Sequence, residues 1–382
     1  MLVRKQQLAF LASLRSDLNC DVAAASRRVF LQSLVGASAL FGLAGCGAFG
    51  SDEPALPPAG TIGRAALLAP LSGSRASIGQ IMRQVASIGG GANGSAEVFV
   101  VDSGETAESA IAAARSAVAD GAVMIAGPLF SGQARPVADA VGRNVPVVAL
   151  TNDSSVAGGS LFVFGVTPLQ SAKSVMGFAA ARGLRDIAVV VPPGQFGELT
   201  IAASQTVASG FGFNLVAPVI SSGSAGLIDE LRRAGDGKLP DAVYLPIVGG
   251  PFEAQAAAIS GAGIQILGSD QWAAINAQRI SVLEDAWYAA PDPVRFEAFA
   301  IALENQAETD VGVVAGLTFD AVEMMRLLGR IGDQNRDGLL REAGFDGIVG
   351  PYRFLESGQC ERGLAILRVT SGATNLIGTT AI

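Results

Sequence analysis

The sequence contains no histidine and only three cysteines among its 382 residues. Without histidine, Ser-His-Asp and Cys-His nucleophile systems and His-containing metal sites cannot form. Charged residues make up 16% of the chain, against about 25% in an average protein. Acidic residues outnumber basic ones, and the net charge of −8 disfavours nucleic acid or anionic lipid as a partner. The composition therefore excludes histidine-based catalysis and disfavours nucleic-acid binding.

Long hydrophobic runs are also missing. The apolar stretch 33–45 is shorter than the roughly 20 residues that a membrane-spanning helix needs. A short apolar run behind two arginines is instead typical of an export signal. The alternative is a solvated arginine pair followed by a buried helix.

Two motifs at this end resemble known signals. Arg27 and Arg28, in "SRRVFL", resemble the twin-arginine export signal. "LAGC" resembles the lipobox of bacterial lipoproteins, in which Cys46 is acylated after cleavage just before it. The resemblance implies that residues 1–45 are removed, that Cys360 is the remaining thiol and that no internal disulfide forms. Residues 46–60, rich in Pro, Gly and Ala, are predicted to be the lipidated cysteine and a flexible linker.

From Thr61 onward, short apolar runs alternate with helical patterns. "AEVFVVD" and "AVMIAGP" are separated by "AESAIAAARSAVADG", and the alternation restarts at "DIAVVVP" and "DAVYLPI". Unbroken apolar strands between helices indicate parallel sheets covered on both faces. We therefore predict an α/β fold of two three-layer Rossmann-like lobes joined by a hinge. The predicted lobes are residues 61–165 plus 293–343, and residues 166–292 plus 344–382.

The order of several motifs resembles one family. "APLSG", "GPLFSGQARPVADAV", "VPVVALTNDSSV" and "GLTFDAVEMMRLL" follow one another as in the type I periplasmic binding proteins of the leucine/isoleucine/valine class. The resemblance covers about 61–369. In detail, "ILGSDQW", "WYAAPDPVRF" and "RGLAILRV" are most similar to a lipoprotein branch known as penicillin-binding protein activators.

Candidate ligand-binding residues lie where predicted strands end, because open α/β sheets bind ligands beyond the carboxyl ends of their strands. They are Ser72, Ser131, Gly132, Thr151, Asn152, Ser154, Phe196, Gly249, Asp270 and Trp272. By resemblance, Ser131 would donate to a carboxylate and Asp270 would accept from an ammonium group. Ordinary turn and cap chemistry is the alternative for the small polar residues. "TNDSS" replaces the usual run of small residues ending in Ala-Thr, which leaves open another small ligand or an empty cleft.

The segment "DQNRDG" from Asp333 invites a calcium interpretation. Asp333, Asn335 and Asp337 fit the start of an EF-hand loop, but the twelfth position is Gly344, where a bidentate carboxylate is needed. We therefore predict a polar turn and a helix N-cap. We expect no metal and no cofactor.

Two functions of different classes remain. The first is a receptor that delivers a small polar solute, an amino acid or a relative, to an ABC permease. The second is a non-enzymatic regulator of a penicillin-binding protein that uses the fold as a scaffold. Both would face the periplasm from a lipid anchor. Gly47 follows Cys46 where the family's inner-membrane retention signal has aspartate, which favours the outer membrane in a Gram-negative cell.

Overall fold

The computed structural model describes residues 63–88, 97–307 and 312–382, with the side chains of 302 and 304–307 excepted. The export-signal arginines Arg27 and Arg28, the lipidation residue Cys46 and the linker 46–60 lie outside the described residues. Within the described ranges, every helix is too short or too polar to cross a membrane.

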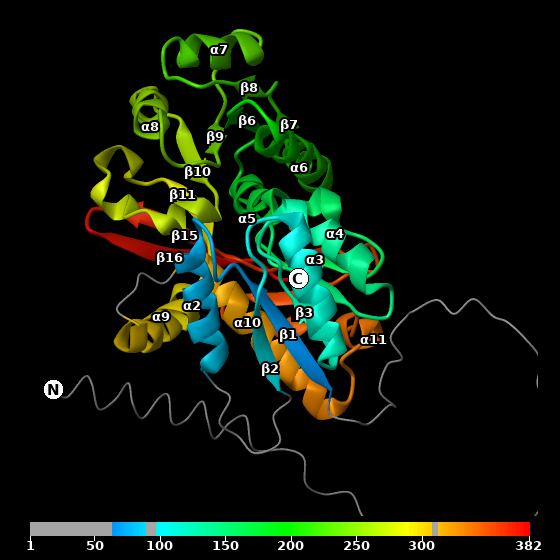
Figure 1. Cartoon of the computed structure of the whole chain (residues 1–382). Coiled ribbons are helices and arrows are strands. Elements are labelled where there is room, and N and C mark those ends of the chain that lie inside the picture. The colour runs from blue at the N-terminus through cyan, green and yellow to red at the C-terminus, as the bar shows by residue number, and fades with distance from the viewer. Residues whose placement is uncertain (1–62, 89–96, 308–311) are drawn as a thin grey trace, which may run out of the picture. The chain divides into compact units, whose positions relative to one another are not determined.

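The first sheet is parallel and has five strands in the order β2-β1-β3-β4-β5 (Figure 1). Its strands are β1 Arg64–Ala69, β2 Val98–Asp102, β3 Ala122–Ala126, β4 Val147–Ala149 and β5 Leu161–Val163. Side chains alternate between the two faces of β1: Leu67 packs on one side and Leu68 on the other. Both faces are therefore buried, as the unbroken apolar runs predict.

Helices cover both faces of this sheet. They are α2 Ala76–Ser87, α3 Ala107–Ala119, α4 Ser131–Val141, α9 Pro293–Ala307, α10 Val313–Ile331 and α11 Arg336–Leu339, with the short η1 Ser154–Val156. The helices α3 and α4 share one core with the sheet, whereas α2 and α10 contribute to another. The predicted N-cap in "DQNRDG" is confirmed, because the Asn335 side chain accepts a 2.8 Å hydrogen bond from Gly338 N at the start of α11.

The second sheet is mixed and has eight strands. The order is β16-β15-β11-β10-β9-β6-β7, and β8 also pairs with β6. Its strands are β6 Asp186–Val191, β7 Asn214–Leu215, β8 Val219–Ile220, β9 Ala242–Leu245, β10 Gln265–Gly268, β11 Trp287–Ala290, β15 Ala365–Thr370 and β16 Ala373–Thr379. The strands β15 and β16 are antiparallel to their neighbours. The predicted parallel arrangement is therefore confirmed for the other six strands of this sheet.

Helices again cover both faces of the second sheet (Figure 1). They are α5 Pro168–Ala181, α6 Gln195–Phe211, α7 Leu227–Ala234 and α8 Phe252–Gly261, with η2 Asp270–Ala274, η3 Ala277–Arg279 and η4 Ser281–Leu283. The start of α5 is a capping box: Gln170 N donates to Thr167 Oγ1, while Thr167 N donates to Gln170 Oε1. Proline at the first position completes a strong helix-start signal.

A third sheet joins β12 Phe345–Asp346, β13 Pro351–Phe354 and β14 Cys360–Arg362 in antiparallel order. It lies against the first sheet, because Val163 N at the end of β5 donates a 2.8 Å hydrogen bond to Gly358 O. Phe162 and Phe354 also meet edge to face, with ring centroids 5.4 Å apart. The sequence-based division assigned this segment to the second lobe, so the lobe boundaries stay a proposal.

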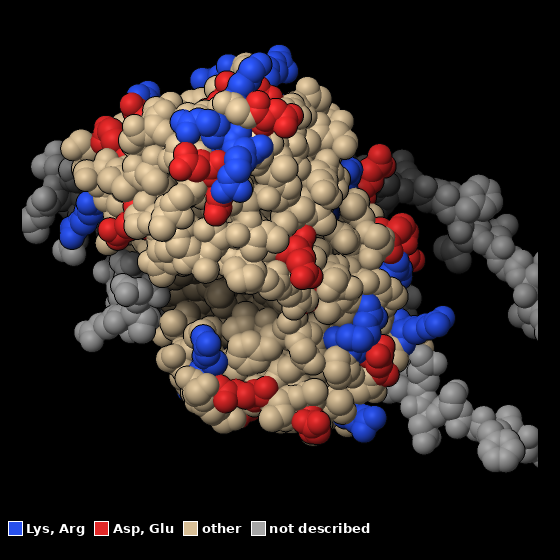
Figure 2. Space-filling view, turned by 90° about the horizontal axis from the view of Figure 1, so that it is seen from above, with Lys and Arg blue, Asp and Glu red and all other residues tan. Residues whose placement is uncertain are grey.

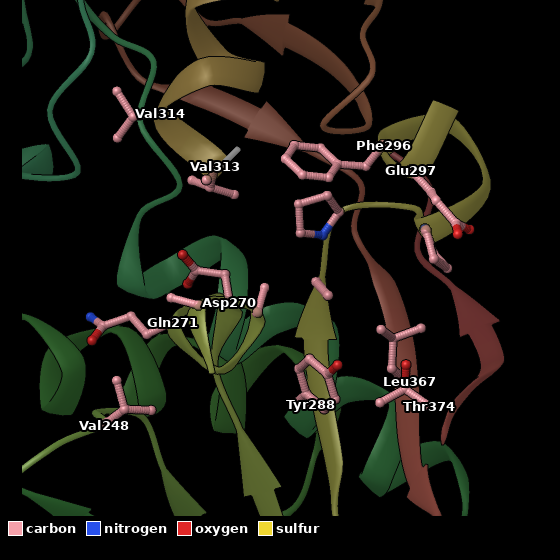
Figure 3. Close-up of a pocket in the computed structure, with 16 residues that line it drawn as sticks. Val248, Asp270, Gln271, Tyr288, Phe296, Glu297, Val313, Val314, Leu367 and Thr374 are labelled. Atoms are coloured by element: carbon pink, nitrogen blue, oxygen red, sulfur yellow. The ribbon is translucent and has the colours of Figure 1, made fainter. Parts of the chain in front are cut away.

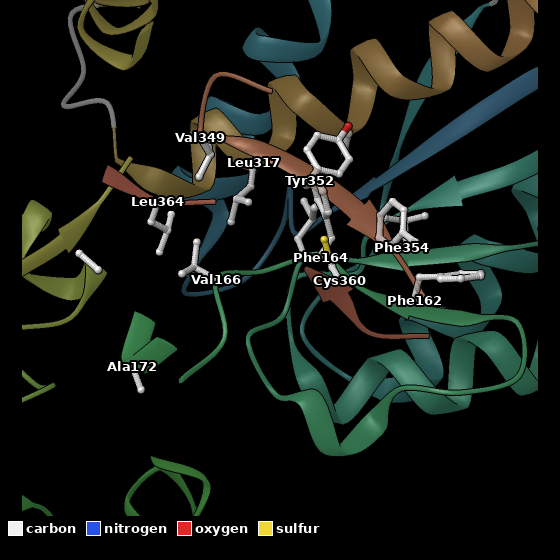
Figure 4. Close-up of a cluster of buried hydrophobic side chains, with 14 of the residues drawn as sticks. Phe162, Phe164, Val166, Ala172, Leu317, Val349, Tyr352, Phe354, Cys360 and Leu364 are labelled. Atoms are coloured by element: carbon white, nitrogen blue, oxygen red, sulfur yellow. The ribbon is translucent and has the colours of Figure 1, made fainter. Parts of the chain in front are cut away.

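The elements of the second sheet are joined to the rest of the described chain by three short segments: 164–167, 291–292 and 363–364. Around the first and third of these segments, buried apolar and aromatic side chains form one cluster, which includes Phe164, Tyr352 and Leu364 (Figure 4). Inside it, Arg362 lies over the ring of Phe164 and 3.7 Å from the carboxylate of Asp320. Both charged side chains are almost completely buried, so each depends on the other for charge compensation.

Candidate ligand-binding site

A cavity of about 710 Å³ lies beyond the carboxyl ends of β10 and β11, between these strands and the beginnings of α9 and α10 (Figure 3). Its size is in the range of small-molecule sites, about 300–1,000 Å³. Most of its wall is apolar and includes Val248, Tyr288, Phe296, Val313, Val314 and Leu367. The polar wall residues include Asp270, Gln271, Glu297 and Thr374. A largely apolar cavity with a few polar groups suits a small organic ligand.

Asp270 is held in place by the turn that follows β10. Ser269 caps η2, because its hydroxyl accepts a 3.2 Å hydrogen bond from Gln271 N. The buried hydroxyl of Ser171 in α5 donates to Asp270 Oδ1 and accepts a 3.2 Å hydrogen bond from Asp270 N. In Figure 3 the carboxyl group of Asp270 points toward the side of the cavity formed by Val313 and Val314.

The carboxyl group of Asp270 is electrostatically unusual. Burial raises its pKa to about 6, although the hydrogen bond from Ser171 opposes this change. Its negative charge adds to burial in raising the pKa of Tyr244 well above the usual range. Among the described residues, no lysine or arginine lies within 4.0 Å of it. A buried carboxylate without a cationic partner is destabilising until a cation arrives.

The second acidic residue of the cavity is Glu297 in α9, which is largely exposed. Figure 3 shows it across the cavity from Asp270, with its carboxyl group directed away. Gln271 and Thr374 add amide and hydroxyl groups to the wall. None of the described wall residues is lysine or arginine. Figure 2 shows a face on which the molecule is hollowed, and the visible floor of the hollow is uncharged.

Of the ten ligand-binding residues predicted from the sequence, Asp270 lines this cavity and the other nine do not. Ser72 is exposed in the loop after β1, where its N–H donates to Asp102 Oδ1 at 3.3 Å. Ser131 and Gly132 begin α4, whose N-cap residue Phe130 makes no side-chain hydrogen bond. The structure thus separates these first-lobe residues from the cavity at Asp270.

The loop containing Thr151, Asn152 and Ser154 faces the second sheet directly. Asp153, in the middle of this loop, accepts a 3.0 Å hydrogen bond from the side-chain amide of Gln195, the first residue of α6. Phe196 follows Gln195 in the same helical turn, and Gly249 is exposed in the loop after β9. Thr151, Asn152, Ser154 and Phe196 are therefore chain neighbours of a direct contact between the two sheets' elements.

Trp272 points into the core instead of the cavity. Its side chain is fully buried, and its indole N–H donates a 3.1 Å hydrogen bond to Leu245 O. The ring packs near Phe252 and Tyr288, with centroids 5.2 and 5.8 Å away. A Cβ on Gly268 would meet the Trp272 ring at 2.3 Å, so glycine at this position makes room for it.

Several wall residues were missed in the sequence. Among them, Tyr288 lies in a strand, while Phe296, Val313 and Val314 come from helices much later in the chain. Ser171, which donates to Asp270 from behind the wall, was missed as well. One signal was available for part of this set. "WYAAPDPVRF" contains Tyr288 and Phe296. It begins with an apolar run that forms β11 and continues past its carboxyl end, where ligands bind in α/β folds.

Comparisons with known proteins agree with this architecture. Residues 64–374 match the family described as periplasmic binding protein, which confirms the family expected from the sequence. A solved structure of a putative branched-chain amino acid ABC transporter from Rhodospirillum rubrum is 21% identical, with a TM-score of 0.68 over 82% of this chain and 99% of that chain.

Two further solved structures have the same fold. The Leu-, Ile-, Val-, Thr- and Ala-binding protein of Brucella ovis is 16% identical, with a TM-score of 0.63 over 83% of this chain and 94% of that one. A solute-binding protein from R. palustris in complex with 4-hydroxybenzoate is 17% identical, with a TM-score of 0.60 over 83% and 96%. A search among curated proteins found no match.

Proposed function

Because the chain belongs to the family of periplasmic binding proteins, we propose that it is a solute receptor whose ligand occupies the cavity at Asp270. Membership places the protein in the cell envelope and makes it a binding protein, not an enzyme. The observation that supports this proposal is the cavity itself: an apolar wall with one buried carboxylate held by Ser171. The ligand would be an amino acid or a relative of one, with its ammonium group at Asp270.

The receptor would deliver its ligand to an ABC-type permease. The proteins of similar fold include ABC transporter components, among them the putative branched-chain amino acid ABC transporter from Rhodospirillum rubrum. We further propose that Cys46 carries lipid and that the chain 46–60 tethers the receptor to the membrane, at the outer membrane in a Gram-negative cell. Ser131, Gly132 and the other first-lobe candidates remain proposed contacts for a ligand that closes the lobes.

Binding can be tested directly on the full-length protein. A thermal-shift screen with amino acids, amines and aromatic acids should reveal a class of ligand, because a compound that binds only the native state raises the unfolding free energy. Isothermal titration of the best compound against Asp270→Ala should then show a large loss of affinity. A screen in which no compound from any class raises the melting temperature would contradict the receptor.

The proposed export signal and lipidation site can be tested separately in cells. Replacing Arg27 and Arg28 by lysine should block export, and Cys46→Ala should abolish labelling with palmitate. A wild-type level of exported, labelled protein in these variants would show that the residues are not the signal.

A regulator of a penicillin-binding protein is the second candidate. The sequence segments "ILGSDQW" and "RGLAILRV" favour it by resemblance, as does Gly47 after Cys46. The direct hydrogen bond between Gln195 and Asp153 near the expected ligand site also supports it, because such a contact suits a protein that uses the fold as a scaffold. Pull-down from envelope extract would support this function if it recovered a penicillin-binding protein equally well with the wild type and with Asp270→Ala.

A further inference from the structure

We propose that the cavity at Asp270 takes an organic cation, an amine on an apolar body that lacks a carboxylate. This inference rests on the proposed receptor function and narrows its ligand class. It differs from the sequence-based expectation, in which both charged ends of an amino acid are held. Three independent features of the described residues support it.

The first feature is the uncompensated charge of Asp270. Its carboxylate lies at the cavity wall with a neutral hydroxyl, that of Ser171, as its hydrogen-bond donor. Tyr244, buried next to this pair, is neutral at physiological pH. A ligand ammonium group would supply the missing positive charge, whereas a neutral ligand would leave a partly buried carboxylate unpaired.

The second feature is the rest of the wall. The other acidic group, Glu297, also favours a positive ligand, and no lysine or arginine occurs among the described wall residues. Phe296 and Tyr288 contribute aromatic rings, whose faces attract cations. A ligand carboxylate in this cavity would lose its hydration and would lie near Asp270 without a cationic partner.

The third feature lies in the first lobe, in the loop after β1, whose backbone N–H groups are of the kind that hold anions. They are already used by the chain's own acidic residues. Asp102 Oδ1 accepts from Leu71 N at 2.9 Å and from Ser72 N at 3.3 Å. Glu105 Oε1 accepts from Arg75 N at 2.8 Å and from the Ser74 hydroxyl at 2.6 Å.

Because the carboxylates of Asp102 and Glu105 already accept these hydrogen bonds, the loop after β1 carries negative charge and is unsuited to binding an anion. The backbone hydrogen bonds lower the pKa of Asp102, and the hydrogen bonds from Ser74 and Arg75 lower that of Glu105. Both groups are therefore ionised at neutral pH. If the lobes close, this loop brings more negative charge toward the ligand, which again favours a cation over a zwitterion.

The decisive experiment compares three probes that share one phenyl-ethyl body and differ in charge. They are 2-phenylethylamine, phenylalanine and 3-phenylpropionate, titrated calorimetrically into the full-length protein at pH 7.5. We expect the amine to bind about 10-fold or more tightly than phenylalanine, because the added carboxylate is desolvated without a partner. We expect no measurable heat from 3-phenylpropionate.

Variants identify the group responsible. Asp270→Asn keeps the shape and the bond with Ser171, and should weaken binding of the amine by about 30-fold or more. Glu297→Gln should have an effect of about twofold, because its charge is screened by solvent. Glu284→Gln is the matched control: this exposed acid precedes the amino end of β11, opposite the cavity, and should not change affinity.

The outcomes separate this inference from the receptor function. If phenylalanine or leucine binds more tightly than the amine, the ligand class is wrong while the receptor stands. Binding of 2-phenylethylamine that survives Asp270→Asn unchanged would also overturn the inference. If neither the amines nor the amino and aromatic acids of the full screen bind, both proposals fail.

Discussion

The side-chain amide of Gln195 donates a 3.0 Å hydrogen bond to Asp153 Oδ2, which links the loop after β4 in the first sheet to the first turn of α6 on the second. Asp153 is itself held by Ser155 N, which donates to Oδ1 at 3.0 Å. The acceptor is therefore fixed, while Gln195 is exposed. This contact joins a loop of the first sheet to a helix on the second sheet.

Introducing a charge at this contact should separate the loops. Gln195→Glu places a second carboxylate against Asp153, and like charges at this distance repel. We expect a larger radius of gyration than that of the wild type by small-angle scattering at pH 7.5. Gln195→Ala, which removes the bond without adding charge, is the control. Equal radii for both variants at pH 7.5 would argue against a repulsive effect.

Asp270→Asn should stabilise the ligand-free protein at neutral pH. The pKa of Asp270 is about 6 in the folded state and about 4 when unfolded, so the folded state binds more protons between these values. The unfolding free energy of the wild type therefore falls as the pH rises through about 6, because the Asp270 carboxyl must ionise in a buried position. We expect the variant to be more stable by about 2 kcal/mol at pH 7.5 and equal to wild type near pH 4.

Urea unfolding at several pH values measures this difference. Tyr244, Tyr288 and Glu297 are the other titratable groups near Asp270, and they are unchanged in the variant. Glu284→Gln should show no comparable pH-dependent gain. A variant that is less stable than wild type at pH 7.5 would mean that Asp270 is needed for folding and that its charge does not destabilise the folded protein.

Arg362→Met should destabilise the cluster between the sheets. The substitution removes the charged partner of Asp320, whose side chain is 2% exposed. The Asp320 carboxylate would then keep the hydrogen bonds from Ile348 N and Val349 N. Breaking a buried pair costs about 3–5 kcal/mol. Burial already raises the pKa of Asp320 to about 6 and Arg362 opposes this, so without Arg362 the pKa rises further.

The loss in Arg362→Met should therefore be larger at pH 8 than at pH 5, where Asp320 is protonated. Arg368→Met is a suitable control, because Arg368 pairs with Asp285 at the exposed edge of the second sheet and exposed pairs contribute about 1 kcal/mol or less. Denaturant unfolding at both pH values distinguishes the two. A pH-independent loss in Arg362→Met would indicate a packing effect.

Trp272→Ala should cost about 3–5 kcal/mol of stability, as expected for a large buried side chain. Trp272→Phe should cost less, although Leu245 O would lose its hydrogen-bond donor. Thermal or urea unfolding measures both. If Trp272→Ala retained wild-type stability, the residue would not belong to the core of the second sheet.

The α/β fold could be predicted because its signals are local. "AVMIAGP" contains β3, "DAVYLPI" contains β9, and Thr167-Pro168 marks the start of α5. Apolar continuity and capping residues act within a few positions, so a single sequence carries them. The position of Asp270 at a strand exit was also predictable, because strand ends collect at one edge of a parallel sheet.

The rest of the site depends on distant contacts. That Glu105 caps the loop at Arg75, 30 residues earlier, follows from the register between β1 and β2 and not from any local motif. Trp272 was predicted at the site because it follows the same strand end as Asp270, but the turn of η2 directs it into the core. Val313 and Phe296 reach the cavity through α10 and α9, whose placement the local pattern does not fix.

The segment 291–292 has a mechanical consequence. It is one of the three short segments that join the elements of the second sheet to the rest of the described chain, and Pro291 belongs both to this segment and to the cavity wall. Short connecting segments restrict sliding, so we expect any relative motion of the two proposed lobes to be a rotation about an axis through these segments. The cavity then lies close to the pivot, where the lever arm is short. A displacement of a few tenths of an ångström imposed by a bound ligand at Pro291 would be magnified at the far ends of the lobes, where a partner protein could detect it.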